Sequence, residues 1–211
     1  MMISAENLAL HRGLTPVLHG LSFAVPAGQL AALTGANGSG KTTLLQTIAG
    51  LITPDAGRIL FDGVERDVED RAPLIHWIAP DNPFKLALTV SENLIFWAAM
   101  MGVRADDDMI AAALHRMEVA HLAGRIVGTL STGQRRRTAL CRLFLAPRPI
   151  WLLDEPALAL DDHAADELIA LTHAHCGDGG CAIVATHRPP RWDANMIIPL
   201  SPEYHLMSEV A

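Results

Sequence analysis

The chain has 211 residues, of which 50% are hydrophobic and 18% are charged. This composition supplies enough apolar side chains for a packed core and excludes a largely disordered protein. The formal net charge of -7 argues against a protein that binds nucleic acid through a broad basic surface.

The three cysteines form no CxxC pair, which fits a reducing compartment. The N-terminus lacks the basic-then-apolar layout of a signal peptide. Residues 13–40 contain no charged side chain, but prolines and glycines interrupt them, so we expect no membrane-spanning helix there. We therefore expect a cytoplasmic protein, and a membrane partner remains compatible with the sequence.

In chain order, the first third predicts short strands and turns. Strands are expected at 21–25 and 29–34, and the second leads into a glycine-rich loop. A helix should follow Lys41, because Leu44, Leu45, Ile48 and Leu51 have helical spacing. A turn at 53–57 then precedes a strand that begins at Arg58.

The middle of the chain predicts helices, which we expect at 91–101, at 106–119 and from Ser131 to about 145. The last third predicts a buried strand at 150–153, a helix at 162–171 and a buried strand at 181–186.

Strands that alternate with helices at both ends of the chain indicate an α/β fold with a parallel sheet. We therefore expect one domain over residues 1–211. Its nucleotide-binding α/β core would comprise 1–75 and 146–211, and an inserted α-helical subdomain would comprise 76–145.

Residues 35–42 fit the pattern G-x-x-x-x-G-K-[ST], the P-loop of nucleotide-binding proteins. Such a loop wraps a polyphosphate in backbone N–H groups, and the following helix directs its positive end at the anion. Lys41 would contact the β- and γ-phosphates, and the Thr42 hydroxyl would hold Mg²⁺. The predicted phosphate-binding residues are Gly35, Ala36, Asn37, Gly38, Ser39, Gly40, Lys41, Thr42 and Thr43.

Asp154 and Glu155 end a buried apolar strand. In a P-loop protein Asp154 would face the metal ion, and Glu155 would polarise the attacking water. His187 follows the next buried strand, where ligands bind in open α/β sheets, and could hydrogen-bond the γ-phosphate.

With Leu130-Ser131-Thr132-Gly133-Gln134 the chain resembles the ATPases of ATP-binding cassette (ABC) transporters, which share a Leu-Ser-Gly-Gly-Gln signature. The order of P-loop, signature, Asp154-Glu155, Ala159-Leu160-Asp161 and His187 is also the family order. The resemblance implies a P-loop NTPase (RecA-like) core and a head-to-tail pair of copies. ATP would lie between the P-loop of one copy and the signature of the other, where Ser131 and Gly133 complete the site. Hydrolysis would then move transmembrane subunits.

Several positions depart from the family pattern. Thr132 replaces a glycine, and Leu158 stands where a small hydroxyl residue is common. Asp81 replaces the glutamine expected near Mg²⁺, and we assign it to the metal site. The residue that stacks on adenine would be His11 or Arg12. These departures concern rates and coupling more than the reaction.

A narrower resemblance rests on segments 88–98, 134–137 and 149–156. They are similar to the ATPase subunit of the bacterial cytochrome c maturation haem exporter. This implies a peripheral protein at the cytoplasmic face of the inner membrane, whose ATP use serves haem release from a periplasmic haem chaperone. The alternatives are an ABC ATPase for another substrate, a soluble ABC protein acting on DNA or ribosomes, and a nucleotide-binding module without turnover.

Three features keep two interpretations each. Residues 135–137, all arginine, form either a solvated basic face or a set of partners for acids or phosphate. Residues 173–176 contain two histidines and a cysteine, but no second cluster completes four ligands, which favours a loop over a metal site. Phe96, Trp97, Met100 and Met101 either pack in a core or line a groove for a membrane subunit's helix.

Overall fold

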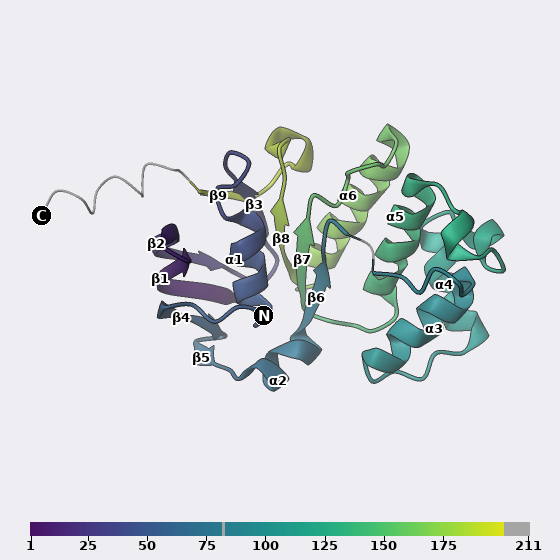
Figure 1. Cartoon of the computed structure of the whole chain (residues 1–211), viewed down its shortest axis with the longest axis horizontal. Coiled ribbons are helices and arrows are strands. Elements are labelled where there is room, and N and C mark those ends of the chain that lie inside the picture. Colours follow the sequence, from purple (N-terminus) through teal and green to yellow (C-terminus); the bar gives the residue numbers. More distant parts are fainter. Residues whose placement is uncertain (82, 201–211) are drawn as a thin grey trace, which may run out of the picture. The chain divides into compact units, whose positions relative to one another are not determined.

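The computed structural model describes residues 1–81 and 83–200, with Pro190 described by its backbone alone (Figure 1). Its contacts divide the chain into two compact units. The sheet unit contains Met1–Trp77, Pro149–Pro156 and the chain from Leu171 onward, and the helical unit contains Ile78–Arg148 and Ala157–Ala170. The subdomain boundaries expected from the sequence stay a prediction.

A parallel sheet forms the centre of the sheet unit, as the sequence predicts. Its strand order is β6-β7-β8-β3-β9. The strands are β6 (Ile75–Ile78), β7 (Ile150–Asp154), β8 (Cys181–Ala185), β3 (Leu30–Thr34) and β9 (Met196–Pro199). All residues of β7 and β8 are buried, which explains their continuous apolar sequences.

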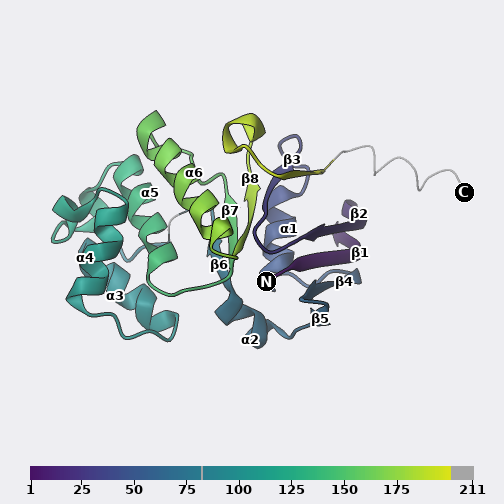
Figure 2. The ribbon, with the colours of Figure 1, turned by 180° about the vertical axis from the view of Figure 1, so that it is seen from behind.

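An antiparallel sheet with order β2-β1-β4-β5 accompanies it and is not predicted by the alternation of strands and helices. Its strands are β1 (Ile3–Arg12), β2 (Thr15–Val25), β4 (Ala56–Phe61) and β5 (Val64–Glu65). Gly13, with φ of 61°, turns the chain between β1 and β2. Seen from behind, these strands lie side by side next to α1 (Figure 2).

Helix α1 (Lys41–Ile48) packs against β7 and β8 and shares one hydrophobic core with both sheets. Leu44, Leu45 and Ile48 lie in this core, as predicted. The expectation that Leu51 extends the helix is wrong, because Gly50 adopts φ of 79° after the last turn and Leu51 is 62% exposed. Shorter helical segments of this unit are α2 (Val68–Arg71), η1 (Ala72–Leu74) and η5 (Pro189–Trp192).

The helical unit contains α3 (Val90–Met100), α4 (Asp107–Arg116), η2 (Ala120–Leu122), η3 (Val127–Thr129), α5 (Thr132–Leu140) and η4 (Cys141–Phe144). Helix α3 begins earlier than predicted, because Thr89 and Glu92 form a reciprocal capping box. Helix α4 ends at Arg116, three residues before the predicted end. Helix α5 is capped by Ser131, and its last part tightens into η4.

Helix α6 (Asp162–Gly177) is longer than the sequence predicts. The loop expected at 173–176 is therefore wrong, and His173, His175 and Cys176 are helical. The ring of His175 stacks on Trp151 with centroids 4.1 Å apart, which gives this histidine a packing role. Within the described ranges, no helix combines the length and apolar character needed to cross a membrane.

Candidate functional site

The predicted P-loop connects β3 to α1 and depends on glycine at several points. Gly35, Gly38 and Gly40 all have positive φ, a conformation that other residues rarely adopt. At Gly40 a Cβ atom would lie 2.6 Å from Cγ1 of Val17, so any side chain there would force Val17 to move. These glycines therefore fix a loop of closely approaching backbone, as phosphate binding requires.

The first turn of α1 offers its N–H groups to an anion. Gly40 precedes the helix in a left-handed conformation, and no side chain caps the helix start. Nearby, the Ser39 Oγ atom is buried without a hydrogen-bond partner in the described chain. Thr43 has a buried side chain, so its contribution to phosphate binding would come from its backbone N–H. Uncapped N–H groups and an orphaned hydroxyl fit a triphosphate.

Lys41 lies across the loop and is only 8% exposed. Its Nζ atom donates hydrogen bonds to the carbonyl oxygens of Gly35 at 2.7 Å and Ala36 at 3.0 Å. The ammonium group is therefore positioned inside the loop that the sequence assigns to phosphates.

The structure brings the P-loop and the acidic pair together. Thr42 Oγ1 donates a 2.6 Å hydrogen bond to Oδ2 of Asp154, although 112 residues separate them. A hydroxyl and a buried carboxylate side by side are hard oxygen ligands, so this pair fits Mg²⁺.

Glu155 follows β7 in a left-handed conformation, with φ of 43°. Its Oε1 atom lies 3.1 Å from Nε2 of His187, and its backbone N–H donates to Ala185 at the end of β8. Burial raises the pKa of the Glu155 carboxyl, while His187 acts in the opposite direction. A carboxylate with raised pKa is a stronger proton acceptor, as a general base needs.

Ser131 and Gly133 lie in the helical unit, at the start of α5. Ser131 Oγ accepts the Gln134 N–H at 3.2 Å, and Gln134 Oε1 accepts the Ser131 N–H at 3.0 Å. The Ser131 hydroxyl keeps its own hydrogen to donate. Because the residue is exposed, it can present that donor and the helix start to a phosphate.

Gly133 is required for packing within the chain. A Cβ atom there would lie 2.8 Å from the carbonyl oxygen of Ala159, at the loop that precedes α6. Thr132 is the first residue of α5 and is not among the residues with positive φ. Replacing the family glycine by Thr132 therefore does not restrict the turn.

The remaining predicted residues are Asp81, His11, Arg12 and Leu158. Asp81 is an exposed residue of the helical unit, and its role at the metal stays a prediction. His11 is oriented by Asp55, whose Oδ2 lies 2.9 Å from His11 Nδ1. This hydrogen bond lowers the pKa of Asp55. Arg12, the alternative for adenine stacking, is the exposed last residue of β1. Leu158 is also exposed.

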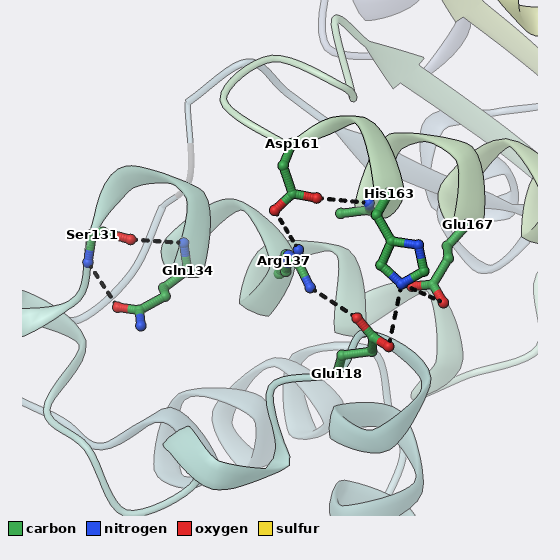
Figure 3. A network of polar contacts seen from close by, with 8 residues as sticks. Glu118, Ser131, Gln134, Arg137, Asp161, His163 and Glu167 are labelled. Atoms are coloured by element: carbon green, nitrogen blue, oxygen red, sulfur yellow. Dashed lines mark hydrogen bonds and ion pairs between the residues drawn. The ribbon is translucent and has the colours of Figure 1, made fainter.

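Two of the three arginines after the signature, Arg136 and Arg137, are held by contacts within the helical unit, and Arg135 is half-buried. Arg136 is 2% exposed and donates to the carbonyl oxygen of Ala79 at 2.6 Å. Arg137 donates to Asp161 at 2.6 Å and to Glu118 at 3.2 Å (Figure 3). No local sequence pattern indicates that Glu118 pairs with Arg137, so the sequence alone does not single out this glutamate.

A P-loop joined to an acidic pair in a parallel sheet defines a P-loop nucleotide-binding protein, and the signature helix capped by Ser131 is the feature it shares with the cassette class. The family model described as ABC transporter matches residues 18–158. The cytochrome c biogenesis ATP-binding export protein CcmA of Roseobacter denitrificans is 46% identical over 187 residues, which are 89% of this chain and 84% of that protein. The CcmA of Ruegeria pomeroyi is 43% identical, over 93% of this chain and 90% of that protein.

This chain therefore belongs to the ABC transporter family and, within it, to the cytochrome c biogenesis ATP-binding export proteins. It is an ATP hydrolase of the kind that is coupled to transport.

Solved structures agree on the fold. The ATP-binding subunit of an ABC transporter matches with a TM-score of 0.82 and 23% identity, over 95% of this chain and 86% of that one. A dimeric post-hydrolysis structure of the cassette MJ0796, bound to ADP and Pi, matches with a TM-score of 0.83 and 23% identity, over 94% of both chains.

Proposed function

We propose that this chain is the ATP-hydrolysing subunit of the exporter that serves cytochrome c biogenesis. It would act as a pair of copies beneath transmembrane subunits, at the cytoplasmic face of the bacterial inner membrane. The observation that carries the catalytic part is the hydrogen bond from Thr42 to Asp154, with Glu155 and His187 beside it.

In this proposal, different residues of the sheet unit bind the phosphates, hold Mg²⁺ and activate water. Lys41 and the N–H groups of 35–43 bind the phosphates, and Thr42 with Asp154 holds Mg²⁺. When bound, Mg²⁺ neutralises charge on the phosphate oxygens. Glu155 accepts a proton from water as the water oxygen bonds to the γ-phosphorus and the bond to the bridging oxygen breaks, which gives ADP and phosphate. His187 donates a hydrogen bond to the γ-phosphate.

The second half of each site comes from the other copy in this proposal. Ser131 donates its hydroxyl hydrogen to the γ-phosphate, and the start of α5 adds its N–H groups. Gly133 keeps the signature close to Ala159, which positions Ser131. Asp81 is the third group assigned to Mg²⁺.

The proposed cargo step is the release of haem from a periplasmic haem chaperone. Support comes from the similarity to proteins named for cytochrome c biogenesis and export, over about nine-tenths of this chain. ATP hydrolysis would change the separation of the paired copies, and the transmembrane subunits would carry that change to the chaperone.

The test is a gentle detergent purification of the tagged full chain from its own membranes, in wild-type and Glu155→Gln forms. Mass spectrometry identifies the co-purified membrane subunits, and haem absorption measures haem-loaded chaperone. We expect Glu155→Gln to retain more haem-loaded chaperone than wild type. Co-purification of a different transporter, with no haem protein in either form, would overturn the proposal.

A further inference from the structure

Three metal-ligating side chains that have no part in the proposed ATP site meet in the helical unit. Glu118 lies between α4 and η2, and His163 and Glu167 are one turn apart on α6 (Figure 3). One ligand atom from each residue lies within 4.8 Å of the others.

The spacing of His163 from each glutamate is close to that of two ligands around one ion, and the two glutamates offer oxygen atoms within 4.8 Å of each other. His163 Nε2 lies 3.6 Å from Oε1 of Glu118 and 3.6 Å from Oε1 of Glu167. Both distances exceed those of hydrogen bonds. Ligand atoms about 2.0–2.1 Å from a tetrahedral zinc ion are about 3.4 Å apart, so only small side-chain adjustments would be needed.

Arg137 orients the ligand that comes from outside α6. Its Nη1 atom donates to Glu118 Oε2 at 3.2 Å, which leaves Oε1 toward His163. Its Nη2 atom donates to Asp161, which in turn accepts the Ala164 N–H at 2.9 Å at the start of α6. Outer contacts of this kind fix the direction of metal ligands.

The local charge also suits a divalent cation. The guanidinium of Arg137 contacts the carboxylates of Glu118 and Asp161. The imidazole of His163, which would bind a metal ion in its neutral form, lies beside the carboxylates of Glu118 and Glu167. The formal charges of all these side chains together leave two negative charges for the ion to balance. The imidazole nitrogen favours zinc and similar transition metals, whereas Mg²⁺ prefers oxygen ligands alone.

We propose that Glu118, His163 and Glu167 bind a divalent transition-metal ion of the zinc type, with water in the fourth position. The ion joins the start of α6 to the segment that follows α4. The site is independent of the proposed transport function, because its residues and its ligand differ from those of the ATP site.

The test is calorimetric titration of the nucleotide-free full chain with ZnCl2 in excess MgCl2. The variants are His163→Ala and Glu118→Gln, and His121→Ala is the matched control, an exposed histidine of the same unit outside the cluster. Wild type and His121→Ala should bind zinc equally. His163→Ala and Glu118→Gln should each bind at least about tenfold more weakly.

A second readout reports geometry instead of affinity. Co²⁺ in place of zinc should give the visible absorption of a four-coordinate site in wild type and lose it in His163→Ala. Equal zinc affinity in wild type and His163→Ala, or no zinc binding by wild type, would overturn the site. Unchanged affinity in Glu118→Gln would overturn the three-ligand assignment.

Discussion

Glu155 Oε1 and His187 Nε2 lie 3.1 Å apart, and each residue follows one of two neighbouring parallel strands, β7 and β8. Strands that pair in parallel deliver their carboxyl ends to one edge of the sheet. The register aligns Asp154 with Ala185, so the residues just beyond these two positions meet. A pairing between distant segments thus follows from strand order.

Glu155→Gln should lower the steady-state rate of ATP hydrolysis by about 10²–10⁴-fold, because a general base contributes that much. Binding of Mg-ATP should remain, since the P-loop is intact. Phosphate release and nucleotide-dependent dimerisation by size-exclusion chromatography measure the two effects. An unchanged rate would remove Glu155 from the role of base.

The same variant should be more stable than wild type at neutral pH. Burial raises the pKa of Glu155 in the folded state, so the protonated carboxyl is the form that the fold favours. That contribution is present below the unfolded-state pKa and is lost as pH rises through the folded-state pKa. Thermal melts from about pH 4 upward, near the ordinary carboxyl pKa, should show the advantage of Glu155→Gln growing until the pH passes the raised folded-state pKa and staying constant above it. A lower melting temperature throughout would contradict this.

The acid limb of the rate profile should depend on His187. Interaction with His187 lowers the pKa of Glu155, so His187→Ala should raise that pKa and move the acid limb of kcat to higher pH. His121→Ala serves as the control, and its profile should match that of wild type. If kcat of His187→Ala is lower but its acid limb stays at the same pH, His187 only contacts the substrate and does not tune the pKa of Glu155.

Lys41→Ala should abolish the stabilisation by Mg-ATP. Ligand at about 100 times its dissociation constant stabilises by about 2.7 kcal/mol, and about 2–4 °C per kcal/mol is expected for a chain of this size. Lys85→Ala is a matched control, because Lys85 is the other lysine and lies over the ring of Phe96. Differential scanning fluorimetry measures both. An equal shift in Lys41→Ala would contradict the assignment of the P-loop.

Gly133→Ala should lower stability, because the added Cβ meets the Ala159 carbonyl oxygen at 2.8 Å. Overpacking costs about 1–3 kcal/mol, partly offset by the better helix propensity of alanine. The rate of hydrolysis should fall further, since Ser131 shifts with the helix. In Gly124→Ala the new Cβ meets nothing within 4 Å, so melting temperature and rate should stay near wild type.

Local patterns predict the residues that act through backbone shape. The P-loop glycines, the Ser131 cap and the buried strand β7 all have short-range signatures, and the structure places them as expected. Strand β1 has no clear alternation because bulges interrupt its register between Ala5 and Leu8 and beyond.

Long-range partners could not be predicted in the same way. Arg137 pairs with Asp161 and Glu118, which are 24 and 19 residues away in the sequence. No periodic sequence pattern indicates these pairs. The last turns of α6 bury Thr172 and Cys176 and stack His175 on Trp151, and such tertiary contacts are not readable from the local sequence.

Arg136 ties α5 to the chain segment that follows β6. Its guanidinium is anchored by the carbonyl oxygen of Ala79, two residues before Asp81, and by that of Pro80 at 3.4 Å. Because this side chain is buried, it cannot exchange these hydrogen bonds for bonds to water. A displacement of Ala79 and Pro80 would therefore act through Arg136 on α5, the helix that Ser131 caps.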